Sequence, residues 1–211
     1  MRDRDPSHGM PHFHRVWSAA HALVSKERCL KLEPSELELL KIELASLAHD
    51  VCDHKYCEPE DVERTLGEMR AVLRDACGLN DAEVEAVLLA AENVSLSREK
   101  KNLLQGAELD RVGARWLRNV VSDADKLDAL GAKGLERIVQ CGPDDFRGLG
   151  DEAWYEQLKT LSKEVAEPRQ GYLIFEASRA LATKLIEEMH EASTDVAFLR
   201  DLKAKTTDPS P

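Results

Sequence analysis

The sequence predicts an all-α fold, a single-domain helical bundle. Apolar residues recur at helical spacing along most of the chain, and two capping-box patterns mark helix starts. No run of alternating β-branched residues lies between turn signals, so strands are not expected. Aromatic residues make up only 5% of the chain, which fits a core packed mainly by Leu, Ala and Val. We therefore expect a helical domain over residues 1–200 and a flexible tail over residues 201–211.

Two start signals and one end signal define the helices of the N-terminal region. Proline suits the first turn of a helix, so Pro11, which follows a glycine turn, is expected to open the first helix. Ser35 and Glu38 form a capping box, in which the serine side chain accepts a backbone N–H and the glutamate reaches back. Apolar residues at helical spacing continue to His49 and Asp50, where this helix is expected to end.

The remaining helices follow from the same kinds of signal. Asn80 and Glu83 repeat the capping pattern and predict another helix start. A longer helix is expected from Leu109 to Gly131, because apolar residues recur along it and glycine favours helix ends. Further helices are predicted over 59–77, 132–140, 152–165 and 170–192.

The charge balance limits the classes of ligand. The 211 residues include 29 Lys and Arg against 40 Asp and Glu, a formal net charge of −11. A general nucleic-acid binder neutralises phosphates over a broad basic face, so a nucleic acid polymer is not an expected partner. A small phosphorylated substrate remains compatible, because it needs only a local cationic pocket or a metal ion.

The apolar stretches, the N-terminal residues and the cysteines of the sequence predict a cytoplasmic protein with no membrane contact. The longest unbroken apolar stretch, residues 86–91, is far shorter than the ~20 residues that span a bilayer. The N-terminal residues contain no apolar signal region. The 5 cysteines are an odd number without a Cys-x-x-Cys pair, which favours reduced thiols over disulfides or a cysteine-ligated zinc.

The first candidate metal ligand lies in the N-terminal helix. His12 and Arg15 are three positions apart, so their side chains share one face of a helix. The imidazole can ligate a metal ion while the guanidinium binds phosphate oxygens. His14 and His21 fall off this face and are expected to be exposed or structural, and His8 is expected in the preceding loop.

The second candidate is the adjacent pair His49 and Asp50. Neighbours in a regular helix point about 100° apart, so they rarely share a target. At a helix end the backbone departs from ideal geometry, and both side chains can turn toward one ion. His49 follows Leu47 and Ala48 and therefore lies close to the apolar face, where an unpaired charge is unfavourable.

The third candidate is a pair of aspartates in the long helix before Gly131. Val121 and Ala124 belong to its inward apolar stripe, and Asp125 and Asp128 continue that stripe. Asp123 is about 200° away from Val121 and is expected to face outward. Carboxylates on the apolar face of a helix require partners, and a cation would supply them.

Together these positions predict a mixed nitrogen and oxygen donor set of His12, His49, Asp50 and Asp125. Such a set suits one divalent ion, and Mn²⁺, Co²⁺, Ni²⁺, Fe²⁺, Zn²⁺ and Mg²⁺ all remain open. Four protein ligands leave coordination positions for water and substrate, as catalysis requires.

These residues resemble the HD-domain metal-dependent phosphohydrolases, whose signature is H…HD…D on a helical core. The likeness is greatest to a compact bacterial-type branch, covers roughly residues 5–140, and is carried by three motifs at 12–17, 49–55 and 123–131. The resemblance implies an HD-type bundle in which the four residues of the donor set bind the metal. Asp125 is the favoured fourth ligand, with Asp123 as the open alternative.

The resemblance also implies hydrolysis of a phosphate ester or phosphoanhydride, with a nucleoside triphosphate or monophosphate as substrate. Asp53 matches the acidic residue that relays protons near the attacking water, and Lys55 is expected to assist it. Arg15, Lys55 and Asp128 are the expected substrate-binding residues. Arg15 and Lys55 would bind phosphate oxygens and so offset the repulsion between the negatively charged chain and an anionic substrate.

Two alternative functions remain open, and so does the oligomeric state. A helical binding or scaffold protein could hold a structural metal ion and catalyse nothing. An HD oxygenase needs ligands for a second iron, and His54 is the one extra histidine near the central motif, so this chemistry is disfavoured. A homodimer is common in such folds and remains compatible with the sequence.

Overall fold

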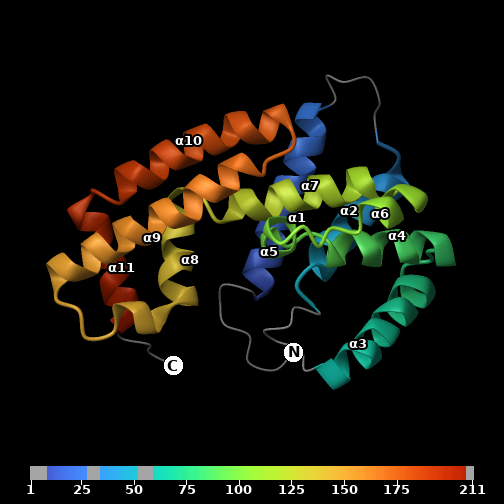
Figure 1. The fold of residues 1–211 in the computed structure, drawn as a ribbon, viewed down its shortest axis with the longest axis horizontal. Helices are drawn as coiled ribbons and strands as arrows, with labels where there is room; N and C mark the ends of the chain where they lie inside the picture. Colours follow the sequence, from blue (N-terminus) through green and yellow to red (C-terminus); the bar gives the residue numbers. More distant parts are fainter. Residues whose placement is uncertain (1–8, 28–33, 52–58, 208–211) are drawn as a thin grey trace. The chain divides into compact units, whose positions relative to one another are not determined.

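The computed structural model describes residues 9–27, 34–51 and 59–207, and every regular element in these ranges is a helix (Figure 1). The all-α prediction is therefore confirmed for the described part of the chain. The α-helices are α1 (Met10–Glu27), α2 (Glu36–Ala48), α3 (Pro59–Ala71), α4 (Asp81–Glu92), α5 (Leu96–Lys100), α6 (Gly106–Arg111), α7 (Arg115–Asp128), α8 (Gly131–Cys141), α9 (Asp151–Gly171), α10 (Glu176–Ala192) and α11 (Val196–Thr207). A short π-helix, Val72–Ala76, continues α3, and a 3-10 turn, Pro143–Phe146, follows α8.

The chain forms two compact units. The central unit is Phe13–Ala124. The C-terminal unit combines the described residues before Phe13 with those from Asp125 onward. The boundaries between the units fall inside α1 and α7, so His12 and Asp125 both belong to the C-terminal unit.

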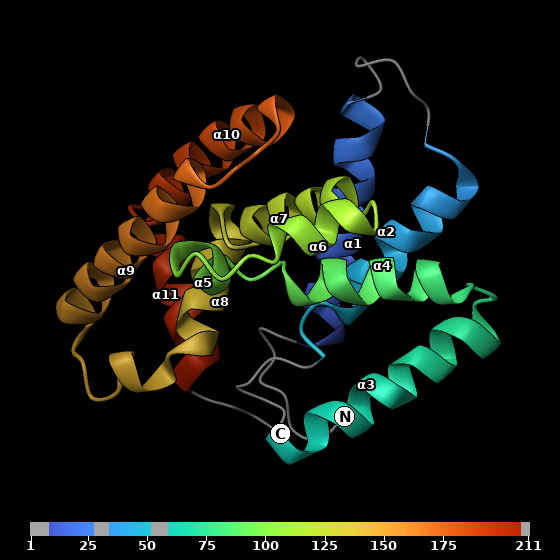
Figure 2. The same cartoon turned by 45° about the vertical axis from the view of Figure 1, so that its right-hand side comes forward.

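The core of the central unit lies where α2 packs against α4, with α6 and the π-helix also in contact with α4 (Figure 2). Its fully buried side chains come from several helices and are aliphatic, as the sequence predicts. They include Ile42, Ala45, Val87, Ala90 and Leu109. His49 directly follows the C-terminal end of α2, the helix that packs against α4.

Both predicted capping boxes are confirmed. The Ser35 hydroxyl accepts a hydrogen bond from the Glu38 backbone N–H at 3.2 Å, and the Glu38 carboxylate accepts one from the Ser35 backbone N–H at 2.7 Å. Asn80 and Glu83 make the same pair of bonds at the start of α4. Each box satisfies backbone donors that the first turn of a helix leaves without intrahelical partners.

The single helix expected between Leu109 and Gly131 is wrong: the segment forms two helices, α6 and α7. Gly113 separates them with a φ of 66°, a left-handed conformation that glycine adopts without a steric penalty. Apolar spacing continues across the break, so the sequence pattern does not reveal it. Gly131 does mark a turn as expected, with a φ of 73°, and α7 ends just before it at Asp128.

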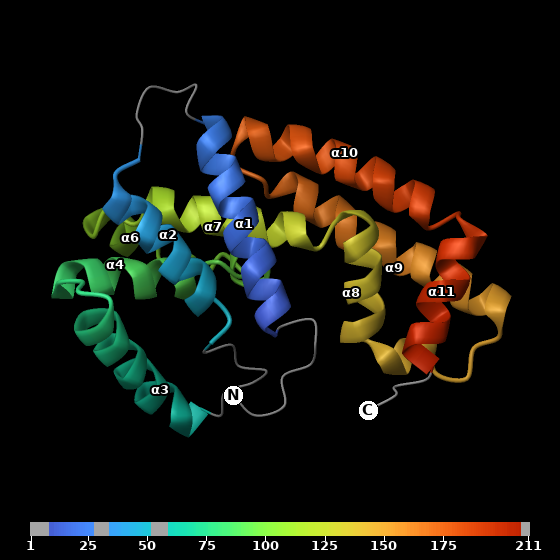
Figure 3. The same cartoon turned by 180° about the vertical axis from the view of Figure 1, so that it is seen from behind.

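In the C-terminal unit, α8 packs against α9, α10 and α11, and α9 and α10 lie side by side (Figure 3). Gly134 allows a close approach here, because a Cβ atom at this position would lie 2.3 Å from the backbone oxygen of Ala129. Met189 of α10 also lies against Gly134, at 3.3 Å from the same Cβ position. Leu135, Trp154 and Leu158 complete a tightly packed interior.

Three boundaries in the C-terminal unit differ from the prediction. Helix α9 continues through Pro168 to Gly171, so α10 begins at Glu176 rather than near residue 170. Proline lacks a backbone donor and its ring crowds the carbonyl four residues earlier, so Pro168 predicts a helix end, yet α9 continues for three residues beyond it. Helix α11 continues to Thr207, so residues 201–207 are helical instead of a flexible tail, and residues 208–211 lie outside the described residues.

None of the helices within the described ranges is both long enough and apolar enough to cross a membrane.

Candidate metal centre

His12 is fully buried in α1 and is held by a carboxylate of the C-terminal unit. Its Nδ1 atom lies 2.8 Å from Oδ2 of Asp128, and the same oxygen accepts a hydrogen bond from Arg137 Nη1 at 2.8 Å. An ionised carboxylate only accepts hydrogen bonds, so the imidazole proton belongs on Nδ1. The Nε2 atom of His12 then carries a lone pair that can bind a metal ion.

That Nε2 atom lies 3.6 Å from Oδ1 of Asp125. This distance is too long for a good hydrogen bond. Two ligand atoms that are each about 2.1 Å from one ion lie roughly 3 to 3.5 Å apart at tetrahedral or octahedral angles. Within the C-terminal unit, His12 and Asp125 are therefore spaced close to what two ligands of one ion require.

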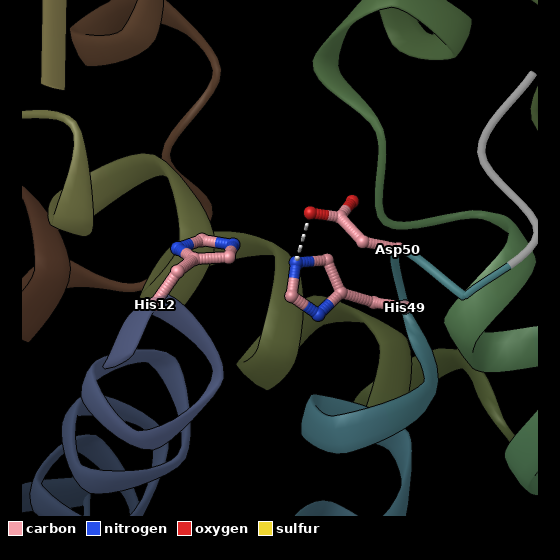
Figure 4. Close-up of side chains that lie close together, drawn as sticks. All are labelled: His12, His49 and Asp50. Atoms are coloured by element: carbon pink, nitrogen blue, oxygen red, sulfur yellow. Dashed lines mark ion pairs between the residues drawn. The ribbon is translucent and has the colours of Figure 1, made fainter. Parts of the chain in front are cut away.

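His49 and Asp50 of the central unit repeat this arrangement (Figure 4). The Nδ1 atom of His49 donates to the backbone oxygen of Ser46 at 2.8 Å, which again leaves Nε2 as the atom with a lone pair. Nε2 of His49 lies 3.5 Å from Oδ2 of Asp50. The His49 ring also meets the Phe13 ring edge-on, with centroids 5.7 Å apart, and this contact fixes the orientation of the imidazole.

The location of this pair at the end of α2 explains how adjacent residues can share a target. Helix α2 ends at Ala48, and His49 and Asp50 lie in the turn that follows. His12, His49 and Asp50 offer imidazole nitrogens and a carboxylate oxygen, which are ligand atoms that divalent metal ions accept. The chemistry of these donors therefore fits a metal ion.

The outward orientation expected for Asp123 is wrong, because Asp123 is fully buried. The reason is that α7 has no single inward stripe. Its five consecutive residues 120–124 are all buried, and five successive positions cover the full circumference of a helix. The Asp125 side chain is the more accessible of the two candidates, at 24% exposed, and it faces Nε2 of His12.

Asp128 lies deeper than a substrate-binding residue is expected to lie. Its side chain is only 5% exposed, and it holds both His12 and Arg137. Direct contact of Asp128 with a substrate stays a prediction. Its carboxylate lies on the Nδ1 side of the His12 imidazole.

Two arginines, one bonded to Asp128 and one interacting with Asp125, have no motif that could have revealed them. Arg137 comes from α8 and Arg169 from α9. Burial lowers the pKa of the Arg169 guanidinium, and the negative charge of Asp125 opposes that shift. Arg169 also donates to the backbone oxygen of Val165 at 2.9 Å. Sequence reasoning missed both arginines because both lie outside the three motifs, Arg137 shortly after the third motif and Arg169 far from it along the chain.

The other predicted residues are placed as follows. Arg15 is half-buried in α1. His14 is exposed and His21 half-buried, and each meets the ring of Trp17 edge-on, at centroid distances of 5.2 and 5.4 Å. Both match the expectation that they are exposed or structural. Asp53, Lys55, His8 and His54 lie outside the described residues.

A pocket of about 270 Å³ in the central unit includes His49 and Asp50 in its lining. Apolar residues of α3 and α4 form much of the wall, and polar residues around the start of α5 form another part. The other lining residues are Ala48, Val62, Leu66, Met69, Leu88, Ala91, Glu92, Ser95, Ser97 and Arg98.

A buried polar network holds the segment that carries the polar part of this wall. The Arg118 guanidinium pairs with the Glu99 carboxylate, and Arg118 Nε donates to the Asn93 backbone oxygen at 2.7 Å. The Asn93 side chain donates to Gln105 Oε1 at 2.8 Å and accepts from the Gln105 backbone N–H at 3.0 Å. Ser122 donates to the Val94 backbone oxygen at 3.2 Å. These bonds fix both ends of α5.

No protein family and no curated protein matches this chain in sequence. Solved structures with a similar fold include YpgQ of Bacillus subtilis in complex with ADP, which is 22% identical, with a TM-score of 0.60. That match covers 98% of this chain and 93% of YpgQ. A Lactobacillus plantarum protein solved as a structural-genomics target is 21% identical over 96% of this chain and 89% of its own, with a TM-score of 0.61. At these identities the likeness establishes the fold.

Proposed function

We propose that the protein is a metal-dependent phosphohydrolase of the HD-domain type. Its substrate is a nucleotide, either a nucleoside triphosphate or a monophosphate, in which it cleaves a phosphoanhydride or phosphate ester. The observation that carries this proposal is the repeated geometry of the two histidines. Each has Nδ1 bonded to an acceptor and Nε2 about 3.5 Å from a carboxylate oxygen, namely Asp125 for His12 and Asp50 for His49.

The proposed ligands of one divalent ion are His12, His49, Asp50 and Asp125. A bound divalent ion would supply Lewis acidity, which lowers the pKa of a water molecule toward neutral pH and offsets the negative charge of a phosphoryl group. The ion can be Mn²⁺, Co²⁺, Ni²⁺, Fe²⁺, Zn²⁺ or Mg²⁺, since all of these accept mixed nitrogen and oxygen ligands.

The hydrogen bonds on the far side of each imidazole have a positioning role in this proposal. Asp128 and the Ser46 carbonyl hold the two rings so that each Nε2 faces a carboxylate, that of Asp125 for His12 and that of Asp50 for His49. Such acceptors fix the tautomer and raise the basicity of a ligating histidine. Asp128 therefore acts on the site through His12, and Arg137 orients Asp128 in turn.

The substrate phosphates need local cations, because a chain of net charge −11 repels an anion as a whole. Arg15 and Lys55 remain the proposed phosphate-binding residues, and Asp53 remains the proposed proton carrier for the attacking water. Arg169 adds a part-buried positive charge close to Asp125. A nucleotide is favoured as substrate because the similarly folded YpgQ was solved with ADP.

A screen of nucleotides with each divalent ion, reading orthophosphate and pyrophosphate separately, tests the proposal. We expect product from at least one nucleotide, and we expect Asp50→Ala to lose both metal retention and turnover. Asp75→Ala is the matched control, because Asp75 is an exposed aspartate of the same unit that does not line the pocket. Turnover retained by Asp50→Ala after metal removal would overturn the proposal. Metal retention without any product would indicate a scaffold protein with a structural ion.

A further inference from the structure

The pocket beside His49 and Asp50 combines two kinds of surface. Helix α3 contributes Val62, Leu66 and Met69, and α4 contributes Leu88 and Ala91, which together make a continuous apolar wall. The polar wall comes from the end of α4 and from α5 with the residue before it, and its members are Glu92, Ser95, Ser97 and Arg98. A ligand that matches both walls has an apolar surface and polar atoms at its edge.

The volume of the pocket limits what it can hold. Sites for complete small ligands usually measure about 300–1,000 Å³. The pocket measures about 270 Å³, so it accommodates one ring system rather than a whole nucleoside triphosphate. The remainder of a nucleotide would extend out of the pocket. His49 and Asp50 also line it, so a ligand bound there lies next to two of the proposed metal ligands.

Arg98 contributes hydrogen-bond donors to the polar wall. Its Nε atom is buried, and no acceptor for it exists among the described residues. Its other nitrogens make only long contacts, 3.3 Å from Nη2 to the Leu103 backbone oxygen and 3.4 Å from Nη1 to Glu92 Oε1. A buried donor without a partner is unfavourable, so a ligand that supplies an acceptor gains binding energy here.

The two serines add a further donor. Ser95 Oγ and Ser97 Oγ lie 2.8 Å apart and share one hydrogen bond. One of their two hydroxyl hydrogens is used in that bond, and the other can reach a second acceptor. A phosphate group suits this wall poorly, because Glu92 already neighbours Arg98 and most of the pocket is apolar.

We infer that this pocket binds the heteroaromatic base of a nucleotide. The flat ring packs against Leu66, Met69 and Leu88, and ring nitrogen or carbonyl oxygen atoms accept hydrogen bonds from Arg98 and from a serine hydroxyl. The aliphatic group of a simple phosphate ester would fill the apolar space but carries no acceptor for Arg98 Nε. This inference rests on the proposed phosphohydrolase function and names the residues that select its substrate.

Methionine methyl NMR tests the inference without any hydrolysis. The chain has 4 methionines, of which Met69 lines the pocket and Met189 is buried in the C-terminal unit. With ¹³C-methyl methionine in the full chain, adenosine, guanosine, cytidine and uridine are titrated one by one, with ribose as control. We expect at least one nucleoside to shift the Met69 signal by its ring current, whereas Met189 does not move and ribose has no effect. Met69→Leu assigns the signal.

The outcomes separate this inference from the proposed function. A Met69 signal unmoved by all four nucleosides at millimolar concentration overturns the base pocket, even when nucleotides are hydrolysed. A Met69 shift in a protein that hydrolyses no nucleotide supports the base pocket and overturns the phosphohydrolase proposal.

A matched pair of arginine variants gives a second readout. Arg98→Gln is expected to reduce the nucleoside-induced Met69 shift and to raise the KM for the nucleotide about tenfold, equal to the loss of one good hydrogen bond. Arg70→Gln removes the same charge from α3 at an exposed residue outside the pocket and is expected to behave as the wild type. Wild-type KM and wild-type Met69 shifts in Arg98→Gln would overturn the inference.

Discussion

The acceptors on Nδ1 of His12 and His49 differ in kind but produce the same tautomer. Asp128 holds one ring with a charged carboxylate, and Ser46 holds the other with a neutral backbone carbonyl. The backbone acceptor cannot be removed by mutating Ser46, whereas Asp128 can be changed directly. The role of the acceptors is therefore best tested at His12.

Asp128→Asn is expected to weaken metal binding by about 10- to 100-fold, because the outer partner of a ligating histidine sets its orientation and basicity. Equilibrium dialysis with Mn²⁺ measures the change in Kd. Glu164→Gln is the matched control, since Glu164 is an exposed carboxylate of the same unit. An unchanged Kd in Asp128→Asn, with circular dichroism showing an intact fold, would contradict the positioning role.

At the scale of the helix, local features are predictable from the sequence and long-range ones are not. The capping boxes at Ser35 and Asn80 depend on residues three positions apart, so the sequence alone identifies both helix starts. The break at Gly113 depends on a backbone conformation that does not interrupt the apolar pattern. The burial of Asp123 depends on what surrounds α7, and helical projection contains no information about the neighbours of a helix.

Ser35→Ala is expected to destabilise the protein by about 1 kcal/mol, because the first turn of α2 loses its side-chain cap. The effect also depends on pH. Hydrogen bonds from the Ser35 backbone N–H and from the Ser35 hydroxyl lower the pKa of Glu38, so the stabilisation from its carboxylate is present above the ordinary glutamate pKa. It is lost as the pH falls through the lowered pKa of the folded state. Ser35→Ala removes the hydroxyl bond and keeps the backbone bond.

Urea unfolding at neutral and acidic pH measures this difference. The gap in unfolding free energy between wild type and Ser35→Ala should narrow as Glu38 becomes protonated. A gap that is constant with pH would show that the Ser35 hydroxyl does not stabilise the ionised carboxylate of Glu38.

At the scale of the molecule, the candidate ligands and the base pocket differ in how far a sequence can predict them. His49 and Asp50 belong to a contiguous motif, and His12 and Asp125 to two others, so sequence motifs are sufficient to propose the donor set. Met69 and Arg98 belong to no motif and become neighbours only when α3, α4 and α5 pack into one pocket. Tertiary packing creates that proximity, so sequence spacing does not reveal it.

Metal binding to the folded chain is expected to raise the melting temperature. An ion that binds only the folded state, at a free concentration of 100 times its Kd, stabilises it by about 2.7 kcal/mol. For a chain of 211 residues this corresponds to a rise in Tm of roughly 5–10 °C. Scanning calorimetry in Mn²⁺ against EDTA measures the rise. The same rise in Asp50→Ala would show that the ion binds elsewhere.

The ion pair between Glu99 and Arg118 has a consequence for engineering this protein. It anchors the backbone of the α5 segment, while Ser95, Ser97 and Arg98 of the same segment line the pocket. The side chains that anchor the α5 segment are thus different from the side chains that line the pocket. A library that varies these three pocket residues while it preserves Glu99 and Arg118 should retain a high fraction of folded variants and change which ring the protein prefers.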